Sequence, residues 1–456
     1  MEKRILRGSD IIEEDGNFDS SSPYVIGFIP HEGNDLLFYF VDFPFTLYVA
    51  LVENKEPKKI LWGRDAPLWQ TSEKIKPVVI TRTEDLITFY FLADGKAERL
   101  QFFLKDILVD RNEDCPSAPL VRSPYNPIIE PRSNVPWDSQ YVFNPAALYL
   151  DGKVHIIYRA IGHSGLSVLG YAASRDAIHI DERSSEPAYV CDGPLQCQKA
   201  DPAFSSWHYS SGGSWSGCED PRLVKIEDTI YMTYTAFGGW GTPPGVALTS
   251  ISVKDFLKKH WSWKKPILIS PPNEMHKNWV LFPEKIHGKY ALLHSLSPKI
   301  IIDYFDDLDF NDNQDVKSHY HSGGREDYWD NWMRGVGPPP IKTNEGWLLL
   351  YHAMDKNDPN KYKVGAMILD SEDPTRILYR SDFPLLEPTT HYENEGFKAG
   401  VVYVCGAVVK DGVLFIYYGG ADTVVCVASA NLNALLTEIK KSTSPTISEN
   451  FVTETL

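Results

Sequence analysis

The alternation of apolar and polar positions predicts β-strands along most of the chain. In the first 125 residues, apolar runs rich in β-branched and aromatic side chains are separated by clusters of Pro, Gly, Asn and Asp. A proline-rich stretch follows and is typical of a connection between domains. We therefore expect an N-terminal β-rich accessory domain in residues 1–125 and a second domain in residues 126–456. The strands expected in the first domain are 24–29, 36–41, 45–52, 78–81 and 86–92.

The second domain repeats one pattern five times. Each copy has a short strand, a tight turn with Asp or Gly, and a second strand that ends in an aromatic residue or His. A third strand follows most copies, and the copies recur about every 55–75 residues, which is typical of radial repetition. Sheets arranged around an axis bury their faces against their neighbours and leave few open edges. The predicted fold is all-β, a five-bladed β-propeller with the N-terminal accessory domain. The five copies are 144–159, 219–234, 282–294, 338–352 and 405–418.

Such a propeller would gather residues from the strand ends at one mouth of its central channel. Acids, histidines and an arginine that converge from distant positions are the usual form of an active site on a rigid scaffold. A carboxylate near a cation can also have its pKa tuned for catalysis. The alternatives are an ion pair of Arg222 with Glu219 or Asp220, and polar side chains that merely meet water. The residues expected at this mouth are Asn144, Arg159, Asp220, Glu284, His294, His352 and Asp422.

Composition narrows the classes of partner. The chain of 456 residues has a formal net charge of −16, which argues against a protein that binds a nucleic-acid backbone. It lacks an apolar run long enough for a membrane span or a signal peptide. The six cysteines show no metal-binding spacing, so we expect no metal and free thiols in the cytoplasm. A Cys191–Cys197 bridge in an oxidising compartment is the alternative.

Several sequence phrases resemble glycoside hydrolase family 130, which contains five-bladed β-mannoside phosphorylases and β-mannosidases. They include Asn-Pro-Ala at 144–146, Glu-Asp-Pro-Arg at 219–222, Leu-Phe-Pro-Glu-Lys at 281–285 and Gly-Gly-Ala-Asp at 419–422. The resemblance covers residues 134–435. It implies that Asp220 is the general acid, which relays its proton to the glycosidic oxygen through a sugar hydroxyl.

The same resemblance implies the residues that bind substrate. Asn144, Arg159 and Asp422 would bind the mannosyl unit, and Lys277 and His294 match a pair that lies near the phosphate in the phosphorylases. Arg222 and His352, which stand in matching phrases, are also placed among the substrate-binding residues.

The attacking group is either water or phosphate, and two departures from the family pattern bear on it. The phosphorylases have arginines after the second copy's Tyr-Thr-Ala strand and directly after the histidine of the third copy. Here residues 237–245 contain no arginine and the second position is Ser295. Guanidinium groups suit bidentate phosphate binding, and neutral residues do not replace them. We therefore expect an inverting, β-1,2-mannosidase-like hydrolase that acts on manno-oligosaccharides and needs no cofactor.

Hydrolysis requires a base to activate water. The candidate is Glu326, in the insertion 325–334, where acids and Trp residues cluster before the fourth copy. Glu284 and Asp303 are the next candidates. An exposed Glu326 that pairs with Arg325 is the structural alternative.

Two other functions remain open from the sequence. One is a phosphorylase that releases mannose 1-phosphate with inorganic phosphate as its second substrate, for which Arg334 could supply the phosphate contact. The other is a propeller that binds glycans without turning them over. We expect an oligosaccharide partner, and neither a nucleic acid nor a membrane. The aromatics of residues 24–52 are a candidate surface for forming a homo-oligomer.

Overall fold

The computed structural model describes residues 24–107 and 120–442. It divides the chain into two compact units, residues 1–117 and 118–456, which are treated separately below. The gaps within the described ranges are 32–33, 42–44, 54–59, 64–68, 72–74, 84–85, 94–95, 192–212, 240–241, 311–315 and 319–321.

The first unit contains two antiparallel sheets with a common core. One sheet has the strand order β1-β2-β3-β4 with β5 paired to β3, and the other has the order β6-β7-β8. Phe38 and Val49 of the first sheet lie in one buried cluster with Phe89 of the second. The elements are β1 (Tyr24–His31), β2 (Asn34–Val41), β3 (Phe45–Glu53), β4 (Ile60–Gly63), β5 (Trp69–Thr71), β6 (Ile75–Thr83), β7 (Leu86–Ala93), β8 (Lys96–Phe103) and α1 (Leu104–Ile107).

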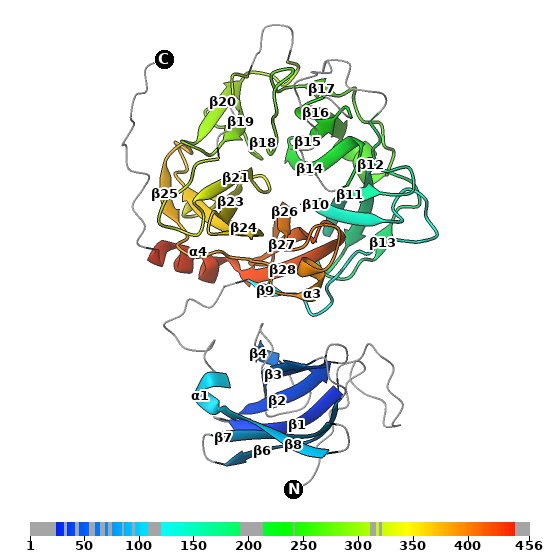
Figure 1. Cartoon of the computed structure of the whole chain (residues 1–456). Coiled ribbons are helices and arrows are strands. Elements are labelled where there is room, and N and C mark those ends of the chain that lie inside the picture. Colours follow the sequence, from blue (N-terminus) through cyan, green and yellow to red (C-terminus); the bar gives the residue numbers. More distant parts are fainter. Residues whose placement is uncertain are drawn as a thin grey trace. The chain divides into compact units, whose positions relative to one another are not determined.

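The second unit consists of successive groups of antiparallel strands that lie around a common centre (Figure 1). The first strand of each group lies nearest the centre (Figure 1), and a short parallel pairing joins the first two groups into one sheet. The inner strands are β10 (Tyr141–Leu150), β14 (Ser216–Ile226), β18 (Val280–Leu281), β21 (Trp332–Val336) and β26 (Val402–Lys410). The strands that follow them are β11 (Lys153–Ile161), β12 (Leu166–Ser174), β13 (Glu182–Arg183), β15 (Thr229–Phe237), β16 (Gly245–Ser252), β17 (Ile267–Leu268), β19 (Tyr290–Ser295), β20 (Ile301–Phe305), β22 (Ile341–Thr343), β23 (Gly346–Asp355), β24 (Asp358–Leu369), β25 (Ile377–Arg380), β27 (Val413–Gly420) and β28 (Val424–Asn431).

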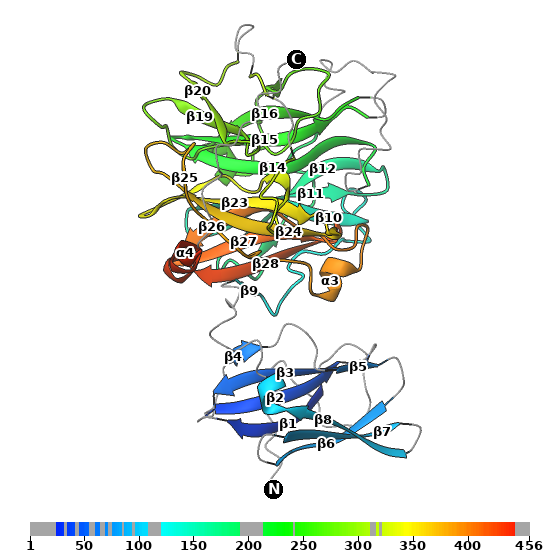
Figure 2. The same cartoon turned by 60° about the vertical axis from the view of Figure 1, so that its left-hand side comes forward.

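The beginning of this unit pairs with its end. The short strand β9 (Val121–Arg122) forms antiparallel pairs with β28, the last of the described strands. The side view shows β9 beside β28 as well (Figure 2). Arg122 also forms a 2.8 Å ion pair with the buried carboxylate of Glu393. Segments about 300 residues apart in sequence are therefore joined by backbone and side-chain contacts.

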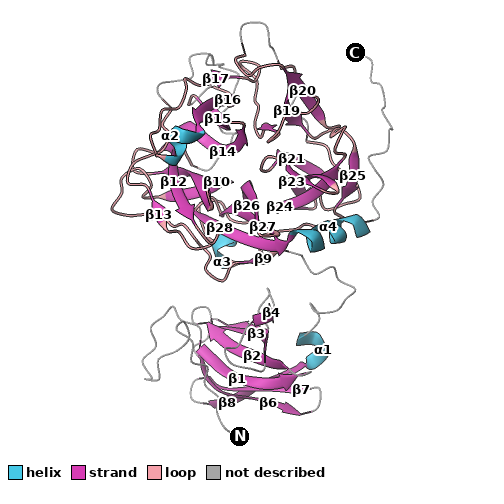
Figure 3. Ribbon diagram, turned by 180° about the vertical axis from the view of Figure 1, so that it is seen from behind, coloured by secondary structure: helices cyan, strands magenta, loops and turns pink. Residues whose placement is uncertain are grey.

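Helices are few and short (Figure 3). In the described part of the second unit they are α2 (Val253–Leu257), α3 (His391–Asn394) and α4 (Leu432–Lys441). Asn431 caps the start of α4, because its side chain accepts a hydrogen bond from the Ala434 N–H group. The all-β class predicted from the sequence is confirmed.

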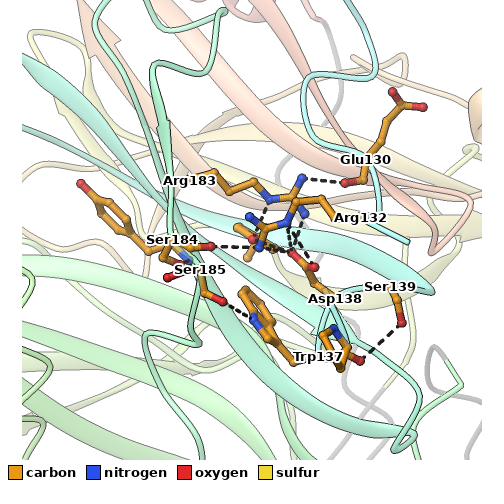
Figure 4. A network of polar contacts seen from close by, with 11 residues as sticks. Glu130, Arg132, Trp137, Asp138, Ser139, Arg183, Ser184 and Ser185 are labelled. Carbon is orange, nitrogen blue, oxygen red and sulfur yellow. Dashed lines mark hydrogen bonds and ion pairs between the residues drawn. The ribbon is translucent and has the colours of Figure 1, made fainter. Parts of the chain in front are cut away.

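The buried carboxylate of Asp138 connects the strands of the first group to the segment that precedes them through hydrogen bonds (Figure 4). Asp138 is fully buried and accepts hydrogen bonds from Arg132 and Arg183, each at 2.7 Å, and from the Tyr158 hydroxyl at 3.2 Å. The Trp137 ring is stacked on Tyr158. A segment without strand structure is thus held against β11 and β13.

The fourth group repeats this arrangement around Asp330. This carboxylate is also fully buried, and it accepts hydrogen bonds from Arg325 at 2.9 Å, Arg380 at 3.0 Å and Tyr351 at 2.6 Å. Trp329 is stacked on Tyr351, as Trp137 is on Tyr158. Residues 325–334, where the sequence placed the candidate base Glu326, therefore contain a second copy of this structural ion-pair network.

Removing the central carboxylate of one network should destabilise the protein. We expect Asp138→Asn to lower the free energy of unfolding by about 3 kcal/mol, because two arginines then lack their buried counter-charge. Urea denaturation measures this change. The matched control is Asp181→Asn, which breaks an exposed pair with Arg175 and should have little effect. Equal losses in the two variants would contradict this role for Asp138.

Candidate functional site

Two polar side chains are turned toward each other by bulges in the inner strands β10 and β14. In each strand the register shifts so that two residues oppose one, at Asn144-Pro145 and at Asp220-Pro221. Asn144 has φ 47° and Asp220 has φ 50°, a left-handed backbone that Asn and Asp tolerate better than most residues. A proline has no N–H group to lose from the strand ladder, which suits it to a bulge. Bulges often re-aim a side chain next to an active site.

The re-aimed side chains meet at one oxygen of Asp220. Its Oδ1 atom accepts a 2.7 Å hydrogen bond from the Asn144 amide and a 3.3 Å bond from Arg159. Asp220 is only 3% exposed. Burial alone would raise the pKa of this carboxyl, but the charges of Arg159, Lys277 and Arg222 outweigh burial and hold the pKa below its usual range. Without ligand, Asp220 is therefore a carboxylate.

Arg159 connects Asp220 to a second buried acid. Its Nη2 atom lies 2.9 Å from the Oε1 atom of Glu219, which is fully buried. Its other donors reach Ser167 at 2.7 Å and Ser214 at 2.9 Å, and the guanidinium lies over the Phe143 ring. These contacts fix the guanidinium between the two carboxylates.

Two lysines and a third acid complete the charged cluster. Burial lowers the pKa of Lys277 to about 8, although Glu219 and Asp220 partly oppose that shift. Burial raises the pKa of Asp422 to about 6, against the opposing charges of Lys398 and Arg159. These mutual effects place Lys277, Lys398 and Asp422 within electrostatic reach of Asp220. Charged groups that perturb one another in this way are typical of functional sites.

Arg222 connects several strands around the cluster. It donates to the Gly337 carbonyl at 2.9 Å, to the Asp220 carbonyl at 2.7 Å and to the Asn278 side chain at 2.8 Å. Tyr403 donates to the same Asn278 oxygen at 2.7 Å. These contacts engage the guanidinium with protein acceptors, and substrate binding by Arg222 stays a prediction.

His352 packs against the same Tyr403. It is fully buried, its ring is stacked on Tyr403 with centroids 4.1 Å apart, and its Nε2 atom accepts from the Val404 N–H group at 2.9 Å. Burial and the nearby Arg222 charge lower its pKa to about 3, so the imidazole is neutral. Asp220 and Arg222 both act on the imidazole electrostatically, and substrate binding by His352 stays a prediction.

The structure does not bring the candidate bases into this cluster. Glu284 is about half exposed and forms an ion pair with Lys342. Glu326 is exposed, and its neighbour Arg325 pairs with Asp330 and Asp382 instead. Asp303 lies 3.5 Å from Nε2 of His294. Among the described residues, the alternative ion pair of Arg325 with Glu326 is not seen, and the role of these acids as bases stays a prediction.

His294 and Lys277 lie in neighbouring segments, as the resemblance implies. The His294 side chain is buried and packs against Trp279, with ring centroids 5.3 Å apart. Trp279 lies two residues after Lys277 in the segment that leads into β18.

Lys398 and the role of Glu219 were missed in the sequence. Glu219 stood in the quoted motif but was interpreted only as a partner for Arg222, whereas its cation is Arg159. Lys398 lies in the segment between α3 and β26, where no repeated strand signals it. The Lys398 N–H group donates a hydrogen bond to the Ala421 carbonyl at 2.9 Å, which brings the Lys398 backbone close to that of Asp422.

In the described part of the chain, no group of three or more His, Cys, Asp or Glu side chains is arranged to hold a metal ion. No described helix has the length and apolar character needed to cross a membrane. Cys218, Cys405 and Cys426 are free thiols, and Cys197, the partner proposed for Cys191, lies outside the described residues.

Comparisons with known proteins identify the relatives of this chain. A family model described as β-1,4-mannooligosaccharide phosphorylase matches residues 119–441. The chain is 37% identical to the 1,2-β-oligomannan phosphorylase of Thermoanaerobacter sp. (strain X514), over 66% of this chain and 94% of the relative. It is 34% identical to the β-1,2-mannobiose phosphorylase of the same strain, over 68% of this chain and 96% of the relative.

A solved structure agrees over the same part of the chain. It is described with the words "The GH130 family of mannoside phosphorylases contains glycoside hydrolases that target beta-1,2 mannosidic linkages in Candida mannan". The identity is 27%, the TM-score is 0.55, and the match covers 69% of this chain and 94% of that one.

These comparisons overturn one prediction and confirm another. The prediction of hydrolysis is contradicted, because the relatives with 34–37% identity are named as phosphorylases. The error came from treating two missing arginines as a missing phosphate site. The family resemblance is confirmed, and the chain belongs to glycoside hydrolase family 130 through residues 119–441.

Proposed function

We propose that this protein is an inverting β-mannoside phosphorylase. It transfers the terminal mannosyl unit of a β-1,2-linked manno-oligosaccharide to inorganic phosphate and releases mannose 1-phosphate. The names of two relatives support this substrate class. The observation that carries the proposal is the group of positive charges gathered around the buried carboxylate of Asp220.

The charges of the cluster suit a phosphate anion. In the described part of the chain, the cations that act on the carboxylates of the cluster include Arg159, Arg222, Lys277 and Lys398, and the acids of the cluster are Glu219, Asp220 and Asp422. When Asp220 is protonated for catalysis, two negative charges remain. A phosphate anion would add about one to two negative charges to oppose these cations. Water offers no such compensation.

The proposed reaction is a single displacement with inversion. A phosphate oxygen attacks C1 of the mannosyl unit while the bond from C1 to the glycosidic oxygen breaks. Asp220 supplies the proton that the leaving oxygen takes up, through a sugar hydroxyl as the family resemblance implies. Asp220 is then the carboxylate of the ligand-free protein again, and the proton of the hydrogen phosphate leaves with the mannose 1-phosphate and is released to solvent.

Phosphate binding also prepares the acid. In the ligand-free cluster, Asn144 and Arg159 both donate to Asp220 and favour its carboxylate form. A phosphate beside Lys277 and Arg159 would offset the cations that hold the pKa of Asp220 low. The pKa would then rise and Asp220 would take up a proton. Phosphate and proton therefore bind together, before the bond is broken.

The other residues receive roles consistent with their contacts. Asn144 and Arg159 orient Asp220 and, together with Asp422, bind hydroxyls of the mannosyl unit. Lys277 and Lys398 bind phosphate. The arginines absent from 237–245 and position 295 are replaced in this account by cations that other segments supply.

We also propose that residues 126–456 form a five-bladed β-propeller catalytic domain, with residues 1–125 as its accessory domain. Inner strands β10, β14 and β26 contact one another, and β9 closes onto β28, which supports a closed ring of blades. Free thiols at Cys218, Cys405 and Cys426 support a reducing compartment such as the cytoplasm.

Product analysis tests the reaction. The protein is incubated with β-1,2-mannobiose, with β-1,4-mannobiose as the comparison, with and without inorganic phosphate. We expect mannose 1-phosphate from the β-1,2 substrate only when phosphate is present. Free mannose formed at the same rate without phosphate would refute the proposal.

The KM for phosphate should depend on pH through Lys277. Because the pKa of Lys277 is about 8, its charge is present at pH 7 and is lost as the pH rises above 8. We expect the KM for phosphate to increase several-fold between pH 7 and pH 9, measured by initial rates at saturating sugar. The variant Lys277→Gln should have a high KM that is nearly constant over this range. A constant KM in the unaltered protein would exclude this role.

A further inference from the structure

Exposed aromatic side chains flank the buried charged cluster. Trp215 and Phe397 are each 49% exposed, which is unusual for rings of this size. Each is next in sequence to a residue of the cluster: Trp215 follows Ser214, and Phe397 precedes Lys398. We refer to these two rings as the aromatic rim.

The backbone around Trp215 holds its ring in place. Its indole N–H donates to the Ser164 carbonyl at 2.8 Å, and its backbone N–H donates to Gly165. Gly165 has φ 70°, and a Cβ atom there would lie 2.9 Å from the indole Cδ1 atom. The close approach therefore requires glycine. Ser214 donates to Glu219 at 2.8 Å and accepts from Arg159, which ties the same segment to the cluster.

Phe397 is fixed to the same segment from the other side. A Cβ atom on Gly213 would lie 2.9 Å from the Phe397 ring, so the ring rests on that backbone. The ring also meets Tyr141 edge to face, with centroids 5.2 Å apart. The Phe397 N–H group donates to Thr423 at 2.8 Å, directly after Asp422. The aromatic rim therefore borders both Arg159 and Asp422.

The position of the aromatic rim along the bound substrate follows from the burial of the charged cluster. Asp220 and Asp422 are 3% and 6% exposed, so the mannosyl unit that is transferred must enter toward them. The rest of the oligosaccharide must then leave past exposed residues. Sugar rings have an apolar face of C–H groups, and large aromatic rings with a free face bury such surfaces with little loss of conformational freedom.

We propose that Trp215 and Phe397 form a binding site for the leaving part of the manno-oligosaccharide, beyond the bond that is cleaved. This inference rests on the proposed function for the identity of the transferred unit. The site would contribute most to substrates longer than the disaccharide, because their additional mannosyl units reach the rim. It would therefore set the preference of the enzyme for chain length.

The test compares substrates of increasing length in matched variants. For Trp215→Ala and Phe397→Ala, we expect kcat/KM for β-1,2-mannotriose and mannotetraose to fall about three- to tenfold. The KM for phosphate should not change. Phe397→Leu keeps apolar bulk without the ring and should lose a similar factor. The control is Tyr379→Ala, which removes an exposed ring on β25 and should leave all constants unchanged.

Titration calorimetry with mannotriose in the absence of phosphate separates this inference from the proposed reaction. Weaker binding in the Trp215→Ala and Phe397→Ala variants, but not in Tyr379→Ala, supports the site whatever product the enzyme forms. Unchanged binding and unchanged kcat/KM would overturn it. An equal loss for all chain lengths together with a raised phosphate KM would overturn it as well, because it would indicate a distorted cluster. Failure of the proposed reaction would appear separately, as the absence of mannose 1-phosphate in the unaltered protein.

Discussion

Asp220→Asn is expected to reduce kcat for phosphorolysis of β-1,2-mannobiose by at least about a thousandfold. The amide cannot supply the proton that the leaving oxygen needs. The fold should persist, since an asparagine oxygen can still accept from Asn144 and the bulge geometry tolerates Asn as well as Asp. Initial rates and thermal unfolding measure the two effects.

A substrate that needs no proton distinguishes acid catalysis from a general loss of the site. With an aryl β-mannoside whose leaving group is a stable phenolate, the loss caused by Asp220→Asn should be far smaller. Asp228→Asn makes the same chemical change in the exposed turn of the same hairpin and should leave the rate unchanged. Equal losses with both kinds of substrate would show that Asp220 is not the acid.

Arg159→Met is expected to abolish activity and to lower the free energy of unfolding by about 3–5 kcal/mol. The reason is that Glu219 is fully buried and its cation is Arg159, at 2.9 Å. Without the guanidinium, the buried carboxylate of Glu219 loses its 2.9 Å ion pair in the core. The hydrogen bonds from Arg159 to Ser167 and Ser214 are also lost. Urea denaturation measures the stability, and phosphorolysis measures the activity.

A double variant separates the two consequences. Arg159→Met combined with Glu219→Gln removes both members of the buried pair, and should recover much of the stability. Activity should not return, because Asp220 and the phosphate still lack the guanidinium. If the double variant were no more stable than Arg159→Met alone, the account of this ion pair would be wrong.

The hairpins of the second unit could be predicted from sequence because their pattern recurs. The first copy, 144–159, lies within β10 and β11, and the second copy lies within β14 and β15. Apolar alternation with a tight turn is a local signal, and five copies reinforce it. The third copy was less accurate, since its first strand, β18, covers only Val280–Leu281. In the first unit, β8 was not predicted because polar and apolar residues are equally frequent in Lys96–Phe103 and it contains no β-branched residue.

The charged site was only partly predictable, because its members are gathered by contacts that spacing does not reveal. The Asn-Pro and Asp-Pro pairs marked the two bulges, and Asn144 and Asp220 do meet there. Lys398 had no such signal, since it reaches the cluster through the segment between α3 and β26. The search for phosphate arginines at fixed positions therefore failed. A positive charge for phosphate binding can come from any segment that the fold brings close to the site.

The interpretation of the segment around Glu326 missed a repeat that the sequence contains. Trp329-Asp330 repeats Trp137-Asp138, and both aspartates are buried between arginines and a tyrosine. This similarity is visible in the sequence but was not used, because the segment was regarded as an insertion with free acids. A repeated Trp-Asp pair before corresponding strands indicates a structural role more strongly than it indicates a base.

The most direct test of the account uses inorganic phosphate labelled with ¹⁸O, β-1,2-mannobiose and mass spectrometry of the products. If phosphate is the nucleophile, the product is mannose 1-phosphate in which the oxygen atom that bridges C1 and phosphorus is ¹⁸O. Free mannose with unlabelled oxygen at C1, formed while the labelled phosphate remains unconsumed, would contradict the central claim.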